Sequence, residues 1–213
     1  MSAPYYILKP AVDTQETGSV FPAVETYPDY DFKGPNSMHR ISKKKFTEFD
    51  IDLRFKLVKN AKLTDVLSQA AINAPGILIS PQFKNQLEGG KVVPHEFLPV
   101  NIEDENGTYH DYFFLHLVWE GRFDAINFSD STFYTGNIED NNILVFSTAS
   151  DFAEARKKFG YFNPIKPKKL ILNSLPFNII LSPLKPEILI DKDTKALFES
   201  TSLSGLKISQ WQS

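Results

Sequence analysis

Two segments of this chain share one order of elements: a short apolar strand, a helix cap, a helix and a second strand. In the first segment, residues 77–79 form the apolar run, Ser80 stands at the cap, Pro81 opens a helix to about Glu88, and a strand follows at 97–102. A Ser side chain at such a cap accepts a backbone amide that the helix leaves unpaired, and Pro suits the first helical position because no N–H is needed there. The pattern predicts a strand–helix–strand unit.

The second segment repeats this order near the end of the sequence. Residues 188–190 are again Ile-Leu-Ile, Asp191 takes the cap, the helix reaches about Glu199, and a strand follows at 206–209. Aligned without gaps, Lys84 matches Lys195, Glu88 matches Glu199 and Leu87 stands opposite Phe198. Two such units predict two related halves, although supersecondary units also recur without common origin.

Alternation along the chain predicts strands in two further segments, of which the first is half-buried. Residues 46–58 place charged side chains on one face and apolar side chains on the other. The apolar face consists of Phe49, Ile51, Leu53, Phe55 and Leu57. Residues 109–119 form the second segment, and Asn106-Gly107 before it predicts a hairpin with residues 97–102.

The remaining elements are predicted from caps and short apolar runs. One helix is expected from a Thr64 cap to about Ala71, and another from a Ser150 cap to Phe159. Strands are expected at residues 5–8, 142–147 and 169–175, and either one strand or a pair of short strands at 123–134.

These elements divide the chain into three parts. Residues 1–45 form an irregular segment with one short strand, residues 46–105 a first α+β half, and residues 106–213 a second half that ends in strand–helix–strand. The predicted fold is therefore α+β, with two similar halves, each a mainly antiparallel sheet with short helices on one face.

Charge and cysteine content restrict the class of protein. A net charge of −3 speaks against nucleic acid as the main partner, because such binders usually carry a basic face. No stretch approaches the roughly 20 apolar residues of a membrane span, and the first residues lack the pattern of a secretion signal. Cysteine is absent, which excludes disulfides and thiolate sites. We expect a cytoplasmic protein with no nucleic-acid or membrane partner.

The residues that most often carry chemistry do not form a recognisable site. His110 and His116 share a strand face, yet six residues at about 3.3 Å each separate them by roughly 20 Å. Two Asp-x-Asp pairs, at 29–31 and 50–52, are explained by turn preference and by charge pairing on a strand. No nucleophile elbow or phosphate-binding loop occurs. We predict no catalytic residue, no cofactor and no metal.

Acidic residues gather in two predicted turns. Glu103, Asp104 and Glu105 crowd the hairpin, and Glu139 with Asp140 occupies another loop. Turn preference and solubility account for such residues. Read functionally, they form a negative lip that meets a basic surface on a partner, where charge raises the association rate. These five residues are the candidate partner contacts.

Phenylalanine is unusually common, at 18 of 213 residues. An aromatic-rich core explains this content, since each ring buries a large area. The alternative is an exposed aromatic recognition surface.

Several of these segments resemble a known bacterial family. The matching stretches are Lys62-Leu63-Thr64-Asp65-Val66-Leu67, Gly76-Ile77-Leu78-Ile79-Ser80, Phe97-Leu98-Pro99-Val100, Lys169-Leu170-Ile171-Leu172 and the closing strand–helix–strand. The family, formerly of unknown function, is now grouped with the immunity proteins of polymorphic toxin systems. The resemblance spans about residues 47–208. It implies a cognate protein toxin as the partner, and it offers no catalytic residue to transfer.

Three functional hypotheses follow from the sequence. The first is a non-enzymatic immunity protein that binds its cognate toxin and blocks it by occlusion, through an interface of about 1,600 Å² with aromatic or charged anchors. The second is an enzyme or small-molecule-binding protein with a cleft between the two halves. The third is a scaffold or assembly subunit. The sequence does not determine the oligomeric state.

Overall fold

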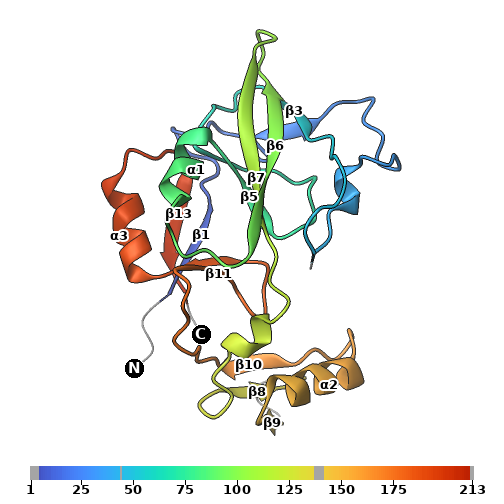
Figure 1. Ribbon diagram of the computed structural model, residues 1–213, viewed down its shortest axis with the longest axis vertical. Coiled ribbons are helices and arrows are strands. Elements are labelled where there is room, and N and C mark those ends of the chain that lie inside the picture. The colour runs from blue at the N-terminus through green and yellow to red at the C-terminus, as the bar shows by residue number, and fades with distance from the viewer. Residues whose placement is uncertain (1–4, 44, 137–141, 212–213) are drawn as a thin grey trace.

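The computed structural model describes residues 5–43, 45–136 and 142–211. Within them the chain forms thirteen strands, three α-helices and two short 3-10 helices, so the predicted α+β class is confirmed. Figure 1 shows a body that contains two of the sheets, and a smaller lobe that contains the third. Among the described helices, none is long and apolar enough to cross a bilayer.

A six-stranded sheet forms the larger part of the body. Its strands, in spatial order, are β2 (Val24–Thr26), β3 (Arg54–Leu57), β6 (His95–Glu103), β7 (Tyr109–Leu117), β5 (Gly76–Ile79) and β4 (Val66–Leu67). Neighbouring strands are antiparallel except for β3 and β6. The nine-residue hairpin of β6 and β7 is the longest pairing, as the Asn106-Gly107 turn predicts.

Strand β7 is buried on both faces, whereas the sequence pattern placed Phe113, Leu115, Leu117 and Trp119 together on one face. Tyr112 and Phe114 pack into one core, whereas Leu115 and Leu117 pack into the other. His116 follows the first face and is fully buried. The strand therefore lies between two cores. Its most exposed residues are those nearest the turn, at the start of the strand.

A four-stranded antiparallel sheet completes the body. Its order is β11 (Ile179–Leu181), β12 (Ile188–Ile190), β1 (Tyr6–Pro10) and β13 (Leu206–Gln210). Strand β1, near the start of the chain, thus lies between β12 and β13 near its end. In Figure 1, β1 (blue) and β13 (red) run side by side.

The lobe, residues 122–169, is inserted between β7 and β11. It contains the 3-10 helix η2 (Arg122–Ala125), α2 (Ala149–Phe159) and a sheet in the order β10 (Lys166–Lys169), β8 (Thr132–Tyr134), β9 (Ile143–Leu144). Aromatic contacts join Phe123, Phe128, Phe133, Phe146 and Phe152. Phe152 of α2 is fully buried among them, so this cluster holds the helix against the sheet.

The predicted strand–helix–strand segments form two units with the same topology. In the first unit, α1 (Pro81–Leu87) connects β5 to β6, β7 lies between these strands, and β4 flanks β5. In the second unit, α3 (Lys192–Ser200) connects β12 to β13, β1 lies between them, and β11 flanks β12. Strand β1 therefore takes the place that β7 has in the first unit.

Equivalent hydrogen bonds fix the cap of each helix. The Ser80 amide donates to the Asp65 carbonyl at 2.8 Å, and the Asp191 amide donates to the Asn178 carbonyl at 3.0 Å. The same pairs also interact through their side chains. Ser80 and Asp191 both accept the amide three residues later, as predicted.

The two units contact each other reciprocally. The Val66 amide of the first unit donates to the Ser204 carbonyl of the second at 3.1 Å, and the Asn178 amide of the second donates to the Lys91 carbonyl of the first at 2.6 Å. The helices meet through Phe83 and Phe198, whose ring centroids are 5.0 Å apart. Both rings belong to one core, so the units fold against each other.

The prediction of two similar halves needs correction. The likeness is confined to the two units, because the sheets have six, four and three strands and the lobe has no counterpart among the described residues. The second unit also takes β1 from the segment 1–45, which was predicted to be irregular with one short strand. The expected boundary between residues 46–105 and 106–213 falls in the turn of the β6–β7 hairpin.

The predicted helix from Thr64 to Ala71 is wrong. Val66 and Leu67 instead form β4 and pair with Ile79 and Leu78. Both are almost fully buried, at 0% and 1% exposure. Tertiary pairing and burial on both sides of a short strand outweigh the local helical pattern.

Other elements are shorter or displaced. Only β3 represents the strand predicted at residues 46–58, and η2 with β8 replaces the strand or pair of short strands predicted at 123–134. Strand β10 ends where the strand at 169–175 was expected to begin, and Leu172 makes only an isolated bridge to Ile126. The segment 1–45 also contains the 3-10 helix η1 (Met38–Arg40) and β2.

Most phenylalanines serve the cores, as the first reading of their abundance predicted. Seven are buried: Phe55, Phe83, Phe114, Phe128, Phe133, Phe152 and Phe198. Six more are partly buried and pack against the larger core: Phe97, Phe113, Phe123, Phe146, Phe159 and Phe177. Four are well exposed: Phe21, Phe32, Phe46 and Phe162. Single exposed rings are normal on a protein surface, so only those with exposed aromatic or apolar neighbours point to a function.

Candidate functional site

The acidic hairpin predicted as a partner contact is ordered by its own acidic residues. The Asp104 carboxylate accepts the amides of Asn106 and Thr108, both at 2.9 Å, and lies 3.0 Å from His110 Nε2. The hydrogen bond with His110, followed by that from Thr108, lowers the pKa of Asp104 below its ordinary value. Asp104 thus shapes the turn.

Glu103 is also engaged within the molecule. Tyr27 donates its hydroxyl to Glu103 Oε2 at 2.6 Å, and Lys56 Nζ lies 3.8 Å from the same oxygen. Burial, followed by this hydrogen bond, raises the pKa of Tyr27 above its ordinary value. Glu105 and Tyr109 remain exposed at the end of the hairpin. Of the three acidic residues, Glu105 is the one most available to a partner.

Glu139 and Asp140 lie outside the described residues. They stay sequence predictions. The hairpin is therefore the one predicted acidic surface whose geometry can be assessed.

Acid–base chemistry finds little support in the described part of the chain. His116 Nδ1 lies 2.7 Å from Glu96 Oε1, and that oxygen also accepts the amide and hydroxyl of Thr47. His116 is fully buried, and its Nε2 lacks a hydrogen-bond partner there. The pair anchors the segment around Thr47 to the sheet, because the Glu96 carboxylate contacts both His116 and Thr47.

The aspartate pairs have structural partners. Asp52 accepts two hydrogen bonds of 2.6 and 2.7 Å from Arg54, two residues further along the chain, whereas the sequence predicted charge pairing across strands. Asp31 accepts the Lys33 amide in a turn. No group of three or more His, Asp or Glu side chains suited to a metal occurs among the described residues.

The least expected surface is the turn between α2 and β10. Helix α2 begins with a capping box of Thr148 and Asp151 and ends at Gly160, whose φ is +69°. Tyr161 and Phe162 follow at once, with 91% and 98% of their surface exposed. Their rings meet edge to face with centroids 5.7 Å apart. We call these two residues the aromatic tip.

The aromatic tip is held from both sides. The Gly160 amide donates to the Arg156 carbonyl, and Asn163 Oδ1 accepts the Gly136 amide at 3.1 Å. Ile165 is buried just beyond. The exposure of the two rings is therefore a property of a fixed turn, which Figure 1 places at the edge of the lobe between α2 and β10.

Cations flank the aromatic tip along the chain. Between residues 156 and 169 the sequence has six basic residues and no acidic one: Arg156, Lys157, Lys158, Lys166, Lys168 and Lys169. All six are exposed, and across the described residues none of them takes part in an ion pair. Burial, followed by the nearby Arg156 cation, lowers the pKa of Arg122. The segment 156–169 is thus locally basic, in a lobe whose residues 122–169 include seven basic and six acidic side chains.

This surface was not predicted from the sequence. The predicted helix ended at Phe159, and the residues between it and β10 were given no role. The available signal was a run of lysines on both sides of Tyr161-Phe162, directly after a glycine that ends a helix. Exposure itself could not be read, because an aromatic pair in a sequence is more often part of a core.

Comparison with known proteins adds no assignment. No protein-family model matches the chain, and no curated protein matches it.

Proposed function

We propose that this chain is a cytoplasmic immunity protein that binds a cognate bacterial toxin and blocks it by occlusion. The observation that carries the proposal is the aromatic tip, two almost fully exposed rings in a fixed and basic turn. The sequence resemblance to immunity proteins of polymorphic toxin systems supplies the class of partner.

Burial of the aromatic tip would contribute strongly to an interface. A Phe or Tyr side chain buries roughly 150–250 Å², and apolar burial is worth about 25 cal/mol per Å². Two rings thus offer several kcal/mol before the cost of association. Because the turn is already ordered by Asn163 and Ile165, little further ordering is required on binding.

The charges favour an acidic region on the partner. Six cations flank the tip, and complementary charge raises the association rate and rejects partners of like charge. The acidic hairpin lies at the opposite end of the molecule in Figure 1. A single compact partner would therefore bind either the aromatic tip or the acidic hairpin, and we assign the toxin-binding surface to the aromatic tip.

The enzymatic alternative has less support. The His116–Glu96 pair is the closest approach to acid–base chemistry, yet the imidazole is fully buried and its contacts are structural. The proposal accordingly assigns no catalytic residue.

Co-expression with the toxin-like product of the adjacent gene tests the proposal. Growth should be restored by the wild-type chain and lost with the double variant Tyr161→Ala/Phe162→Ala. Loss of two central aromatic anchors should weaken binding on the order of 100-fold or more. Both rings are exposed, so circular dichroism and the unfolding midpoint should stay as in the wild type.

Two control variants locate the interface. Phe46→Ala removes another exposed ring, at 48% exposure and outside the lobe, and should leave rescue intact. Glu105→Lys/Tyr109→Ala alters the exposed end of the hairpin. If that hairpin variant failed to restore growth while Tyr161→Ala/Phe162→Ala restored it fully, the toxin-binding surface would be the hairpin and not the aromatic tip. Continued poisoning by the wild type without any complex would overturn the immunity function.

A further inference from the structure

A pocket of about 410 Å³ lies where the two sheets of the body meet. One side comes from the end of β1, the following segment and β13; the other comes from β4 and β5. Its lining residues are Lys9, Pro10, Ala11, Val12, Thr14, Phe21, Leu67, Ser68, Gln69, Gly76, Ile77, Leu78 and Lys207. This volume falls within the range of small-molecule sites, roughly 300–1,000 Å³.

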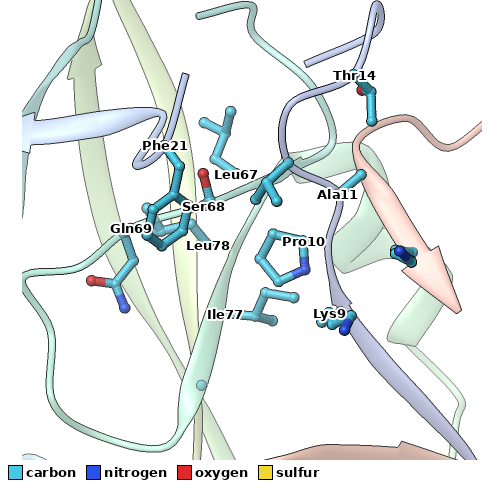
Figure 2. A pocket seen from close by; sticks show the side chains of 13 residues that line it. Lys9, Pro10, Ala11, Thr14, Phe21, Leu67, Ser68, Gln69, Ile77 and Leu78 are labelled. Atoms are coloured by element: carbon cyan, nitrogen blue, oxygen red, sulfur yellow. The ribbon is translucent and has the colours of Figure 1, made fainter. Parts of the chain in front are cut away.

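The wall of the pocket is more apolar than polar. Figure 2 shows Phe21 on one side and Pro10 on the other, with Leu67 and Leu78 behind them. Phe21 is 62% exposed, although it borders an apolar hollow. A large ring left open to water beside apolar neighbours is the arrangement that an apolar ligand would cover.

The neutral polar side chains of the wall already have partners. Ser68 Oγ accepts the Ala23 amide at 2.9 Å, and Gln69 bonds both the amide and the carbonyl of Ile72. Thr14 pairs with Thr17. These groups hold the wall in shape and leave little capacity to bind a ligand.

Two lysines supply the remaining polar contacts. Lys9 and Lys207 are partners across the β1–β13 ladder, and like charges in that relation repel each other. Both are exposed, and within the described residues neither forms an ion pair. No acidic residue is present in the described lining. Glu16, on the neighbouring loop, accepts the Gly205 amide at 2.7 Å.

We propose that this pocket binds an amphipathic carboxylate, such as a medium-chain fatty acid. The apolar chain occupies the hollow between Phe21 and Pro10, and the carboxylate lies at Lys9 and Lys207, where an anion relieves their repulsion. The site is separate from the aromatic tip, so it stands or falls independently of the immunity function.

Calorimetry with decanoate and decanol tests the proposal on the whole chain, below the concentration at which decanoate forms micelles. Decanoate should bind with at least tenfold higher affinity than decanol. The variant Lys9→Gln/Lys207→Gln should weaken decanoate binding about tenfold and leave decanol binding unchanged, since tenfold corresponds to about 1.4 kcal/mol. The matched variant Lys33→Gln/Lys192→Gln removes two exposed charges elsewhere and should bind as the wild type does.

The apolar part is tested by Phe21→Ser, which should weaken decanoate and decanol alike because it opens one wall without touching the lysines. Equal affinity for acid and alcohol would overturn the assignment of the anion site. Absence of binding by either probe to the folded wild type would overturn the pocket as a whole. If the matched variant Lys33→Gln/Lys192→Gln weakened decanoate binding as much as Lys9→Gln/Lys207→Gln does, the preference for decanoate over decanol would come from the net charge of the protein. That result would also contradict the proposal.

Discussion

Single residues at the contact between the two units tolerate little change. Gly205 lies where the second unit meets β4, and the Ala11 amide donates to its carbonyl at 2.8 Å. Its φ is +71°. A Cβ at this position would lie 2.3 Å from Thr64 Oγ1 and 2.4 Å from the Val66 carbonyl oxygen. Both the backbone conformation and the close approach therefore require glycine.

Gly205→Ala should destabilise the protein by about 2–4 kcal/mol, since left-handed strain adds to a clash with main-chain atoms. Gly160→Ala is the matched control. Its φ of +69° is similar, and no atom lies within 4 Å of the added Cβ, so only strain is expected. Because ψ is −169°, the backbone lies in a region almost restricted to glycine, and this strain should cost about 1–3 kcal/mol. Urea unfolding of both variants gives the comparison. An equal loss of unfolding free energy in the two variants would show that the close contact at Gly205 does not contribute to stability.

The Asp191 cap predicts a pH dependence. Burial opposes its ionisation, but hydrogen bonds from Asn178 and Thr194 outweigh this, so its pKa lies below the ordinary 3.8. A lowered folded-state pKa contributes stability above the unfolded value, and that stability is lost as pH falls through the folded value. Asp191→Asn keeps a capping side chain and should cost about 0.5 kcal/mol at pH 7, a small value because water screens a partly exposed charge.

Unfolding curves from pH 7 down to pH 3 check this prediction. The difference between wild type and Asp191→Asn should narrow below pH 3.8. A constant difference across that range would mean that the charge of the carboxylate makes no contribution.

At the scale of elements, the sequence correctly predicted the features that depend on hydrogen bonds between residues close together in the chain. The caps Ser80 and Asp191 and the β6–β7 turn were predicted because their hydrogen bonds join residues three or four apart. The cap of α2 was misplaced at Ser150, since Thr148 and Asp151 form the capping box. Strand β4 was missed because its pairing with β5 and its contact with Ser204, 138 residues further on, leave no local pattern.

The contact between α1 and α3 predicts energetic coupling between the units. Phe83→Ala and Phe198→Ala should each cost about 3–5 kcal/mol, because both rings are almost fully buried. In a double-mutant cycle they should couple by about 0.5–1.5 kcal/mol, as an aromatic pair does. Phe83→Ala with Phe55→Ala is the control, since Phe55 lies in the other core and its cost should add within about 0.5 kcal/mol. Additive costs for Phe83 and Phe198 would contradict a shared core.

At the scale of the whole molecule, charge is distributed unevenly. The lobe, with the basic segment 156–169, lies at one end and the acidic hairpin at the other (Figure 1). The sequence reading found the acidic end because turn residues are locally recognisable. It missed the basic end because only the fold reveals that Tyr161 and Phe162 stay outside the aromatic cluster of the lobe. Composition gives the number of aromatic rings, and packing decides which remain exposed.

The affinity of the purified chain for the product of the adjacent gene tests the protein-binding account most directly. Titration calorimetry should give a Kd in the nanomolar range or below, about −12 kcal/mol, that weakens at high salt because cations flank the tip. Tyr161→Ala/Phe162→Ala should raise this Kd by on the order of 100-fold or more, and Phe46→Ala should not. Unchanged affinity of the folded tip variant, or no binding by the wild type, would contradict it.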